Sequence, residues 1–193
     1  KPISSKFNDS WKRISEKRVS AHNKFIKLAN FSDFIVFSII CSQIPAQYQI
    51  QAANSSPIRY LQLFNLSNSN DTYCNRGTSG IDGSTSTAVG AALVSDSPVL
   101  LITGDLSFFY DINGLWNNYI KSDFRIILIN NSGGGIFRIL PGHENNEIFS
   151  KFIETKHDLK AKKIAQLYGF DYQNKTTKWG VKLALKTFFK KSK

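Results

Sequence analysis

Two short polar clusters follow apolar runs of the kind that form buried strands. A Gly-Asp pair ending at Asp105 comes directly after residues 99–103. An Asn-Asn pair ending at Asn131 comes directly after residues 125–129. Because ligands of open parallel sheets bind beyond the carboxyl ends of the strands, we expect these side chains to meet there, together with the carbonyls of the following glycine-rich turn. Such hard oxygen donors suit Mg²⁺ and a diphosphate.

A simpler interpretation gives the same residues local structural roles. Asp105 would cap the helix that follows its strand, and the two asparagines would form an Asx turn. That interpretation is sufficient for a Gly-Asp pair alone. The sequence Asn-Asn-Ser-Gly-Gly-Gly at the next strand end favours the metal site instead, because glycines let the backbone approach a diphosphate closely.

The two earlier strand ends carry hydroxyl and guanidinium groups. Arg59 lies one helical turn beyond Ser55, which predicts that both side chains share one face of a helix. A guanidinium binds a carboxylate bidentately, although a lone arginine more often forms a surface ion pair. Arg76 stands between a strand and a glycine-rich loop, and this position favours a functional role.

The elements that must position these residues alternate between helices and strands. We expect helices at 8–28 (with Ser10 as its cap), 32–42, 56–64, 83–94, 110–120, 159–168 and 179–189, and strands at 48–53, 72–74, 99–103, 125–129 and 170–172. Alternating strands and helices imply parallel crossover connections. The predicted fold class is therefore α/β, with three layers, α/β/α, and a central parallel sheet.

Composition argues against several classes of protein. The 193 residues include 25 Lys+Arg and 14 Asp+Glu, a net charge of +11, but the positive charge gathers in the first 28 residues and after residue 150. No RNA-binding signature accompanies it, so we expect no nucleic-acid partner. Two cysteines form no disulfide framework, and the longest apolar run, 34–41, is too short to span a bilayer, so we expect a cytoplasmic protein without a membrane partner.

The remaining candidate residues are assigned structural roles. The histidines share no ligand spacing, and we expect each to be structural or solvated: His22, His143 and His157. Cys41 lies in an apolar run and is expected in the core, and Cys74 has no adjacent base that would make it a nucleophile.

Six motifs resemble those of thiamine-diphosphate-dependent enzymes, and within them the synthase family of the menaquinone pathway. The motifs are Asn75-Arg76-Gly77, Ser79-Gly80-Ile81-Asp82-Gly83, Gly104-Asp105-Leu106-Ser107, Tyr110-Asp111-Ile112-Asn113, Asn130-Asn131-Ser132-Gly133-Gly134 and Ile136-Phe137. Leu106 stands where most thiamine-diphosphate enzymes have glycine, and it matches the synthase family. The resemblance is dense over residues 54–141 and looser elsewhere.

The resemblance implies a role for each matching residue. The metal, Mg²⁺ or Mn²⁺, would be held by Asp105, Asn131 and the carbonyl of Gly133. Thiamine diphosphate would be bound by Ser79, Gly80, Ile81, Asp82, Gly104, Asp105, Leu106, Ser107 and Asn131. The substrates, 2-oxoglutarate and isochorismate, would be met by Asn54, Ser55, Arg59, Arg76, Ile136 and Phe137.

The resemblance also implies a larger protein. Residues 1–30 are expected to form a linker with a helical lead-in, and residues 31–193 the diphosphate-binding domain, truncated before its last strand. The pyrimidine-binding domain, with the glutamate that activates the cofactor, and a middle domain would lie upstream. No catalytic residue is therefore expected in this chain, which would be inactive alone and part of a homodimer or homotetramer.

Two other interpretations remain open from the residues. The chain could be the corresponding domain of another thiamine-diphosphate decarboxylase or carboligase. It could also be a non-catalytic α/β binding module that binds nucleic acid through its basic ends.

Overall fold

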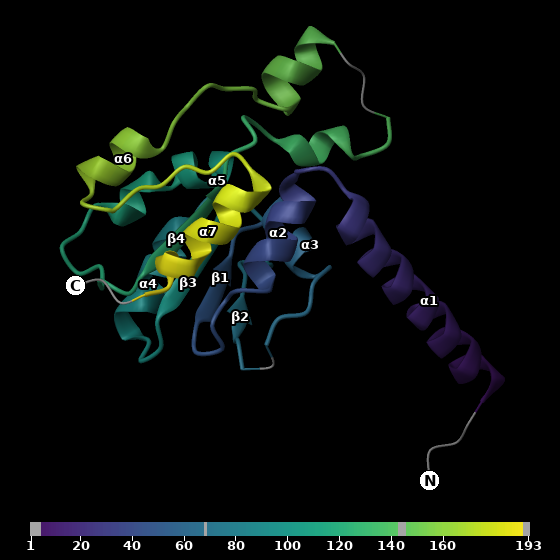
Figure 1. The fold of residues 1–193 in the computed structure, drawn as a ribbon. Coiled ribbons are helices and arrows are strands. Elements are labelled where there is room, and N and C mark those ends of the chain that lie inside the picture. Colours follow the sequence, from purple (N-terminus) through teal and green to yellow (C-terminus); the bar gives the residue numbers. More distant parts are fainter. Residues whose placement is uncertain (1–4, 68, 143–145, 191–193) are drawn as a thin grey trace.

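A four-stranded parallel sheet forms the centre of the molecule, with strand order β2-β1-β3-β4. The computed structural model describes residues 5–67, 69–142 and 146–190 (Figure 1). The strands are β1 (Gln49–Ala52), β2 (Thr72–Tyr73), β3 (Val99–Gly104) and β4 (Arg125–Ile129). The helices are α1 (Lys6–Leu28), α2 (Asp33–Cys41), α3 (Ser56–Leu61), α4 (Ser84–Val94), α5 (Asp105–Tyr110), α6 (Lys162–Leu167) and α7 (Lys178–Phe188), with short turns η1 (Ile112–Leu115), η2 (Gly135–Arg138) and η3 (Phe149–Ile153).

β3 is the most deeply buried strand. It pairs with β1, where Leu101 lies beside Gln51, and with β4, where Leu101 lies beside Ile126. Its first five residues are at most 1% exposed, because helices cover both faces of the sheet. A parallel strand buried on both faces reads as a continuous apolar run, and this is why the sequence predicts β3 correctly.

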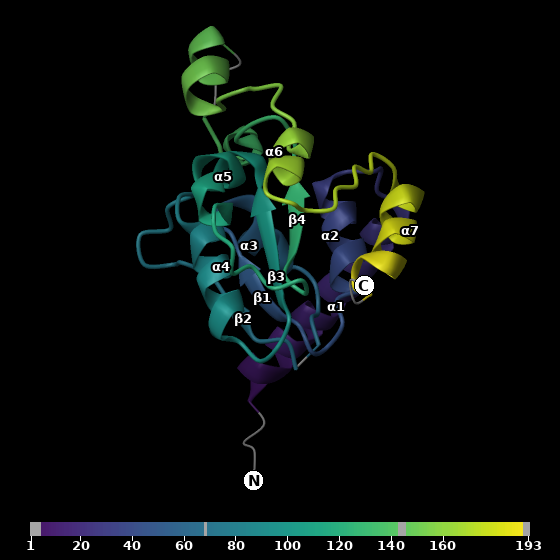
Figure 2. The same cartoon turned by 90° about the vertical axis from the view of Figure 1, so that its left-hand side faces the viewer.

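The two faces of the sheet hold separate apolar cores. On one face, α2, α3 and α7 pack against Ile50, Leu100 and Ile102. On the other face, α4, α5 and α6 pack against Val99 and Leu101. Figure 2 shows α2 and α7 on one side of the strands and α4 and α5 on the other. The predicted three-layer α/β/α fold is confirmed.

Three local predictions are wrong. The expected helix at 110–120 is replaced by α5, which begins at once after β3, and by the short turn η1, whose Gly114 lies against the backbone of α4. Residues 170–172 form no strand, because the Phe170 N–H bonds to the Ala165 carbonyl and closes α6 instead. Ser5 rather than Ser10 caps α1, since its hydroxyl accepts a hydrogen bond from the Asn8 N–H.

α1 is a helix, as predicted, but it buries none of its residues. It projects from the rest of the chain (Figure 1), and Trp11 is 65% exposed. Within the described chain, only its last turns contact the rest of the domain. There the ring centroids of Phe25 and Phe34 lie 5.2 Å apart, and His22 packs against Phe34 and Phe64. His22 is thus a packing residue, as expected.

Candidate functional site

The Asp105 side chain links the end of β3 to the turn after β4 by a hydrogen bond. It is the first residue of α5 and is only 2% exposed. Its Oδ1 accepts a hydrogen bond from the Leu106 N–H at 2.8 Å, and its Oδ2 accepts one from the Gly133 N–H at 3.0 Å. The structure therefore brings the Gly-Asp pair and the glycine-rich turn together, as their positions after neighbouring strands predict.

The turn after β4 contains a position, residue 133, that only glycine fits. Gly133 has φ +146°, and a Cβ there would lie 2.8 Å from the Glu154 carbonyl oxygen. The Gly134 N–H donates to that same oxygen at 2.6 Å. The turn is held in place by residue 154, and its Gly133 N–H reaches the Asp105 carboxylate at the end of β3.

Asn131 turns its amide nitrogen toward α2. Nδ2 donates to Oδ2 of Asp33 at 2.9 Å, a contact between residues far apart in sequence. Oδ1, the atom of an amide that can bind a metal, takes no part in that contact. Asn131 thus lies near the strand end but is oriented by the first turn of α2.

Asn54 is a buried brace at the end of β1. It is 1% exposed, and its Nδ2 donates to the carbonyls of Asn75 at 2.8 Å and Gly80 at 2.6 Å. Its Oδ1 accepts hydrogen bonds from Arg76 at 3.1 Å and from the Cys74 thiol at 3.3 Å. The polar atoms of Asn54 are therefore used to shape the loop after β2.

Ser55 and Arg59 lie together at the start of α3. Ser55 has φ +72°, a strained conformation for a residue with a side chain, and its carbonyl accepts a hydrogen bond from Nη1 of Arg59 at 2.8 Å. Ser55 precedes α3 rather than lying in it, and the contact joins the Arg59 guanidinium to its backbone carbonyl, so the predicted shared face of the two side chains remains a prediction. Arg59 is exposed, so its guanidinium is accessible to a ligand.

The loop after β2 contacts the first turn of α5. The buried Ser107 hydroxyl donates to the Ile81 carbonyl at 2.5 Å, and Ser79 has φ +59° with its hydroxyl bonded to the Arg76 carbonyl. Asp82 is exposed, and Ile81 is half-buried. Of the predicted cofactor residues in these two segments, the structure thus places Ile81 beside Ser107.

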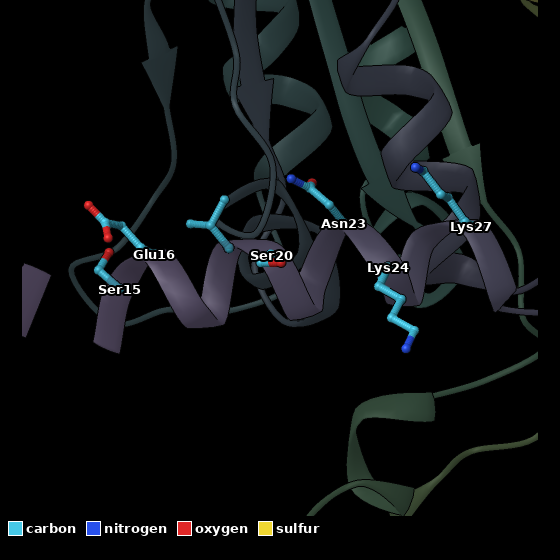
Figure 3. A pocket seen from close by; sticks show the side chains of 7 residues that line it. Ser15, Glu16, Ser20, Asn23, Lys24 and Lys27 are labelled. Atoms are coloured by element: carbon cyan, nitrogen blue, oxygen red, sulfur yellow. The ribbon is translucent and has the colours of Figure 1, made fainter. Parts of the chain in front are cut away.

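Ile136 and Phe137 belong to η2, beyond the turn. Phe137 lines an apolar hollow of about 370 Å³, together with residues of η3. Ile136 is half-buried and does not line it. A second hollow, of about 610 Å³, is lined by residues of α1 alone (Figure 3), so it contains no strand-end residue.

Sequence reasoning missed one residue beside Asp105. His157 has a side chain that is 11% exposed, and its Nε2 lies 3.3 Å from Oδ2 of Asp105. Nothing in its spacing from other candidates signals this contact, because the chain returns to the strand end only after η2 and η3. His143 lies outside the described residues.

The donor set at the strand end is made of oxygens. Among the described residues, no group of three His, Cys, Asp or Glu side chains could hold a metal ion. A cation here would bind the Asp105 carboxylate, the Asn131 amide oxygen and the Gly133 carbonyl, which are donors that Mg²⁺ accepts. The residues therefore fit a magnesium-bound diphosphate.

Neither cysteine suits a nucleophilic role. Burial raises the pKa of the Cys41 thiol to about 12. Burial also raises the pKa of Cys74, and the nearby Arg76 charge opposes this effect. Both thiols are therefore protonated at neutral pH, as their expected structural roles require.

The Glu154 side chain holds its segment against η2 through a hydrogen bond with Arg138. A hydrogen bond from the Arg138 guanidinium lowers the pKa of its carboxyl, against the opposing effect of burial. A carboxyl with a lowered pKa stabilises the fold above its ordinary pKa of 4.5, and this contribution is lost as the pH falls through the lower, folded-state value.

We expect Glu154→Gln to lower the thermal unfolding midpoint at pH 7. The difference from the wild type should shrink as the pH falls below about 4.5, because the wild-type carboxyl then also loses its charge. Thermal unfolding followed by circular dichroism across pH 3–7 measures this. Glu147→Gln, on the same segment and exposed, serves as the control. A difference that stays constant with pH would contradict the role of the Glu154 charge.

No helix among the described residues has the length and apolar character needed to cross a bilayer.

Comparison with known proteins defines the class. Residues 55–193 match the family described as thiamine pyrophosphate enzyme, C-terminal TPP binding domain. The chain belongs to this family. Two solved structures share its fold: benzoylformate decarboxylase from Polynucleobacter necessarius (TM-score 0.66, 19% identity, 82% of this chain and 31% of that one) and 4-hydroxybenzoylformate decarboxylase from Rhodococcus jostii RHA1 (TM-score 0.61, 20% identity, 82% and 30%).

More similar relatives share one name, 2-succinyl-5-enolpyruvyl-6-hydroxy-3-cyclohexene-1-carboxylate synthase. The chain is 52% identical to that of Christiangramia forsetii over 181 residues, which are 94% of this chain and 31% of the relative. It is 55% identical to that of Flavobacterium psychrophilum over 160 residues, 83% of this chain and 29% of the relative. The chain thus spans about a third of the length of these curated relatives.

Proposed function

We propose that this chain holds the diphosphate and the divalent metal of thiamine diphosphate in a 2-succinyl-5-enolpyruvyl-6-hydroxy-3-cyclohexene-1-carboxylate synthase. The observation that carries the proposal is the buried Asp105 carboxylate, which is hydrogen-bonded to the backbone of Gly133 at the ends of two adjacent strands. The names of the relatives support the particular activity.

The metal ligands in this proposal are Asp105, the Asn131 amide oxygen and the Gly133 carbonyl, with Mg²⁺ or Mn²⁺ as the ion. Gly104, Leu106 and Ser107 would line the diphosphate, and residues 79–82 would lie against the rest of the cofactor. The hydrogen bond from Ser107 to Ile81 supports this, because it couples the two surfaces that the cofactor would touch. Thiamine diphosphate, when bound, supplies the electron sink needed to remove CO₂ from a 2-oxo acid.

The substrates in this proposal are 2-oxoglutarate and isochorismate, both of which carry carboxylates. The exposed guanidinium groups of Arg59 and Arg76 would bind them, and Ser55 and Phe137 would shape the approach. Asn54 would act through its hydrogen bond to Arg76. Ile136 would stand behind Phe137 on η2.

The rest of the enzyme is part of the same proposal. Residues 1–30 would form a lead-in and residues 31–193 the diphosphate-binding domain, which would work with a pyrimidine-binding domain and its activating glutamate in a cytoplasmic homo-oligomer of the menaquinone pathway. A length about a third of that of the relatives supports this division. A non-catalytic basic module is not favoured, because most of the chain matches a cofactor-binding family.

The arginine assignments are tested in the complete enzyme. We expect Arg59→Ala and Arg76→Ala each to raise the KM for 2-oxoglutarate by about 10-fold or more, since a charged hydrogen bond contributes roughly 1.5–3 kcal/mol. Steady-state kinetics measure this, with Arg18→Ala on the exposed α1 as the matched control. If both variants behave like the control, the substrate assignment is wrong.

A further inference from the structure

His157 returns to the strand end on an irregular backbone. Thr155, two residues earlier, has φ +52°, and the His157 N–H donates to the Ser132 carbonyl at 3.3 Å. The imidazole lies edge-on to the Phe109 ring at 5.6 Å, and its Nε2 faces Asp105. Contacts on three sides therefore hold the ring beside the carboxylate.

The position of the imidazole proton follows from a backbone contact. The Leu159 N–H donates to Nδ1 of His157 at 3.1 Å, so Nδ1 is the unprotonated nitrogen of the neutral ring. The proton then resides on Nε2, which lies 3.3 Å from Oδ2 of Asp105. Nε2 is buried and makes no hydrogen bond among the described residues, and the Asp105 carboxylate is an acceptor 3.3 Å from it.

The two carboxylate oxygens of Asp105 have different neighbours. Oδ2 accepts the Gly133 N–H at 3.0 Å and has Nε2 of His157 3.3 Å away, so it is crowded on two sides. Oδ1 accepts only the Leu106 N–H among the contacts the structure gives it, and it keeps one lone pair for a cation. The orientation of the carboxylate thus selects Oδ1 as the ligand atom.

We propose that His157 is a positioning residue that fixes the Asp105 carboxylate for divalent-metal binding. This inference rests on the proposed function, because it takes Asp105 as a metal ligand. Hydrogen bonds to a ligating carboxylate orient it before the metal arrives, and loss of such a partner typically lowers metal affinity by about 10- to 100-fold.

Two amide substitutions separate positioning from simple packing. In His157→Asn the amide can still accept from the Leu159 N–H but is too short to reach Asp105. In His157→Gln the longer side chain can place an N–H near Oδ2. Positioning predicts that the Asn variant binds the metal poorly and that the Gln variant is rescued.

The test is a Mn²⁺ titration of the wild-type chain and both variants, with thiamine diphosphate present, followed by electron paramagnetic resonance. We expect Mn²⁺ affinity to fall about 10-fold in His157→Asn and to stay within about threefold of the wild type in His157→Gln. Thermal midpoints, measured in parallel, should not follow this order, and the spectrum of bound Mn²⁺ should change in the Asn variant.

The outcomes are distinguishable. Equal Mn²⁺ affinity in all three proteins, or affinities that follow the thermal midpoints, would overturn the positioning role and leave the proposed function standing. Failure of the wild-type chain to bind Mn²⁺ with thiamine diphosphate would overturn the metal assignment, and the inference with it.

Discussion

Replacement of Asp105 by asparagine should abolish saturable binding of thiamine diphosphate with Mg²⁺ over the concentrations that saturate the wild-type chain. Loss of a residue that hydrogen-bonds to a metal ligand lowers metal affinity by about 10- to 100-fold. Loss of the charged ligand itself should therefore lower it by about 100-fold or more. Isothermal titration calorimetry on the 193-residue chain measures this. The substitution should also lower stability by about 1–3 kcal/mol, because an amide that keeps the Leu106 bond turns an N–H toward the Gly133 N–H.

The matched control for this experiment is Asp96→Asn. Asp96 is exposed in the connection between α4 and β3, at the opposite ends of the strands. Its loss removes the same charge without touching the site, and cofactor binding should not change. Saturable binding of unchanged affinity in Asp105→Asn would remove the main support for the metal site.

Replacement of Gly114 by alanine should destabilise the chain by about 1–3 kcal/mol, the usual cost of overpacking. A Cβ at Gly114 would lie 2.8 Å from both Cα and N of Ser86, in the first turn of α4. Backbone atoms cannot move aside as a flexible side chain can. The clash would also strain the Asp111 carboxylate, whose Oδ2 accepts hydrogen bonds from the Ser86 N–H at 2.7 Å and from its hydroxyl at 3.0 Å.

We expect Gly90→Ala, also in α4, to raise stability rather than lower it. Gly90 is exposed in the middle of α4, and a Cβ there would meet nothing within 4 Å. Alanine should stabilise the helix by about 0.5–1 kcal/mol. Urea unfolding of the two variants measures both effects. A Gly114→Ala variant as stable as the wild type would show that η1 does not lie as close to the backbone of α4 as described.

The sequence predicts those parts of the fold whose character is local. β3 appears as an apolar run because both of its faces are covered. β4 appears as one too, but the full burial predicted for it is wrong, because it is an edge strand and its residues are only half-buried. α2 and α7 appear because the helix period marks them and Pro45 limits α2. The helix expected at 110–120 fails because contact with α4, not local preference, shapes that segment. The strand expected at 170–172 fails because the Phe170 N–H is used to close α6.

The candidate site divides in the same way. Contact between Asp105 and Gly133 is predictable, since each follows one of two neighbouring parallel strands. The bracing role of Asn54 and the approach of His157 are not, because both depend on loops whose paths no periodicity encodes. The relation of Asn131 to Asp33 likewise depends on how α2 packs.

The strand order has a consequence for how the chain reaches its folded state. β1 has β3 as its inner partner, with Gln49 beside Val99, fifty positions further along the chain. On a ribosome, β1 must therefore wait until α3, β2 and α4 have emerged before its inner edge is paired. The cost of closing so long a loop precedes the gain from the contacts. During that interval the open edge of β1 is exposed to pairing with other nascent chains.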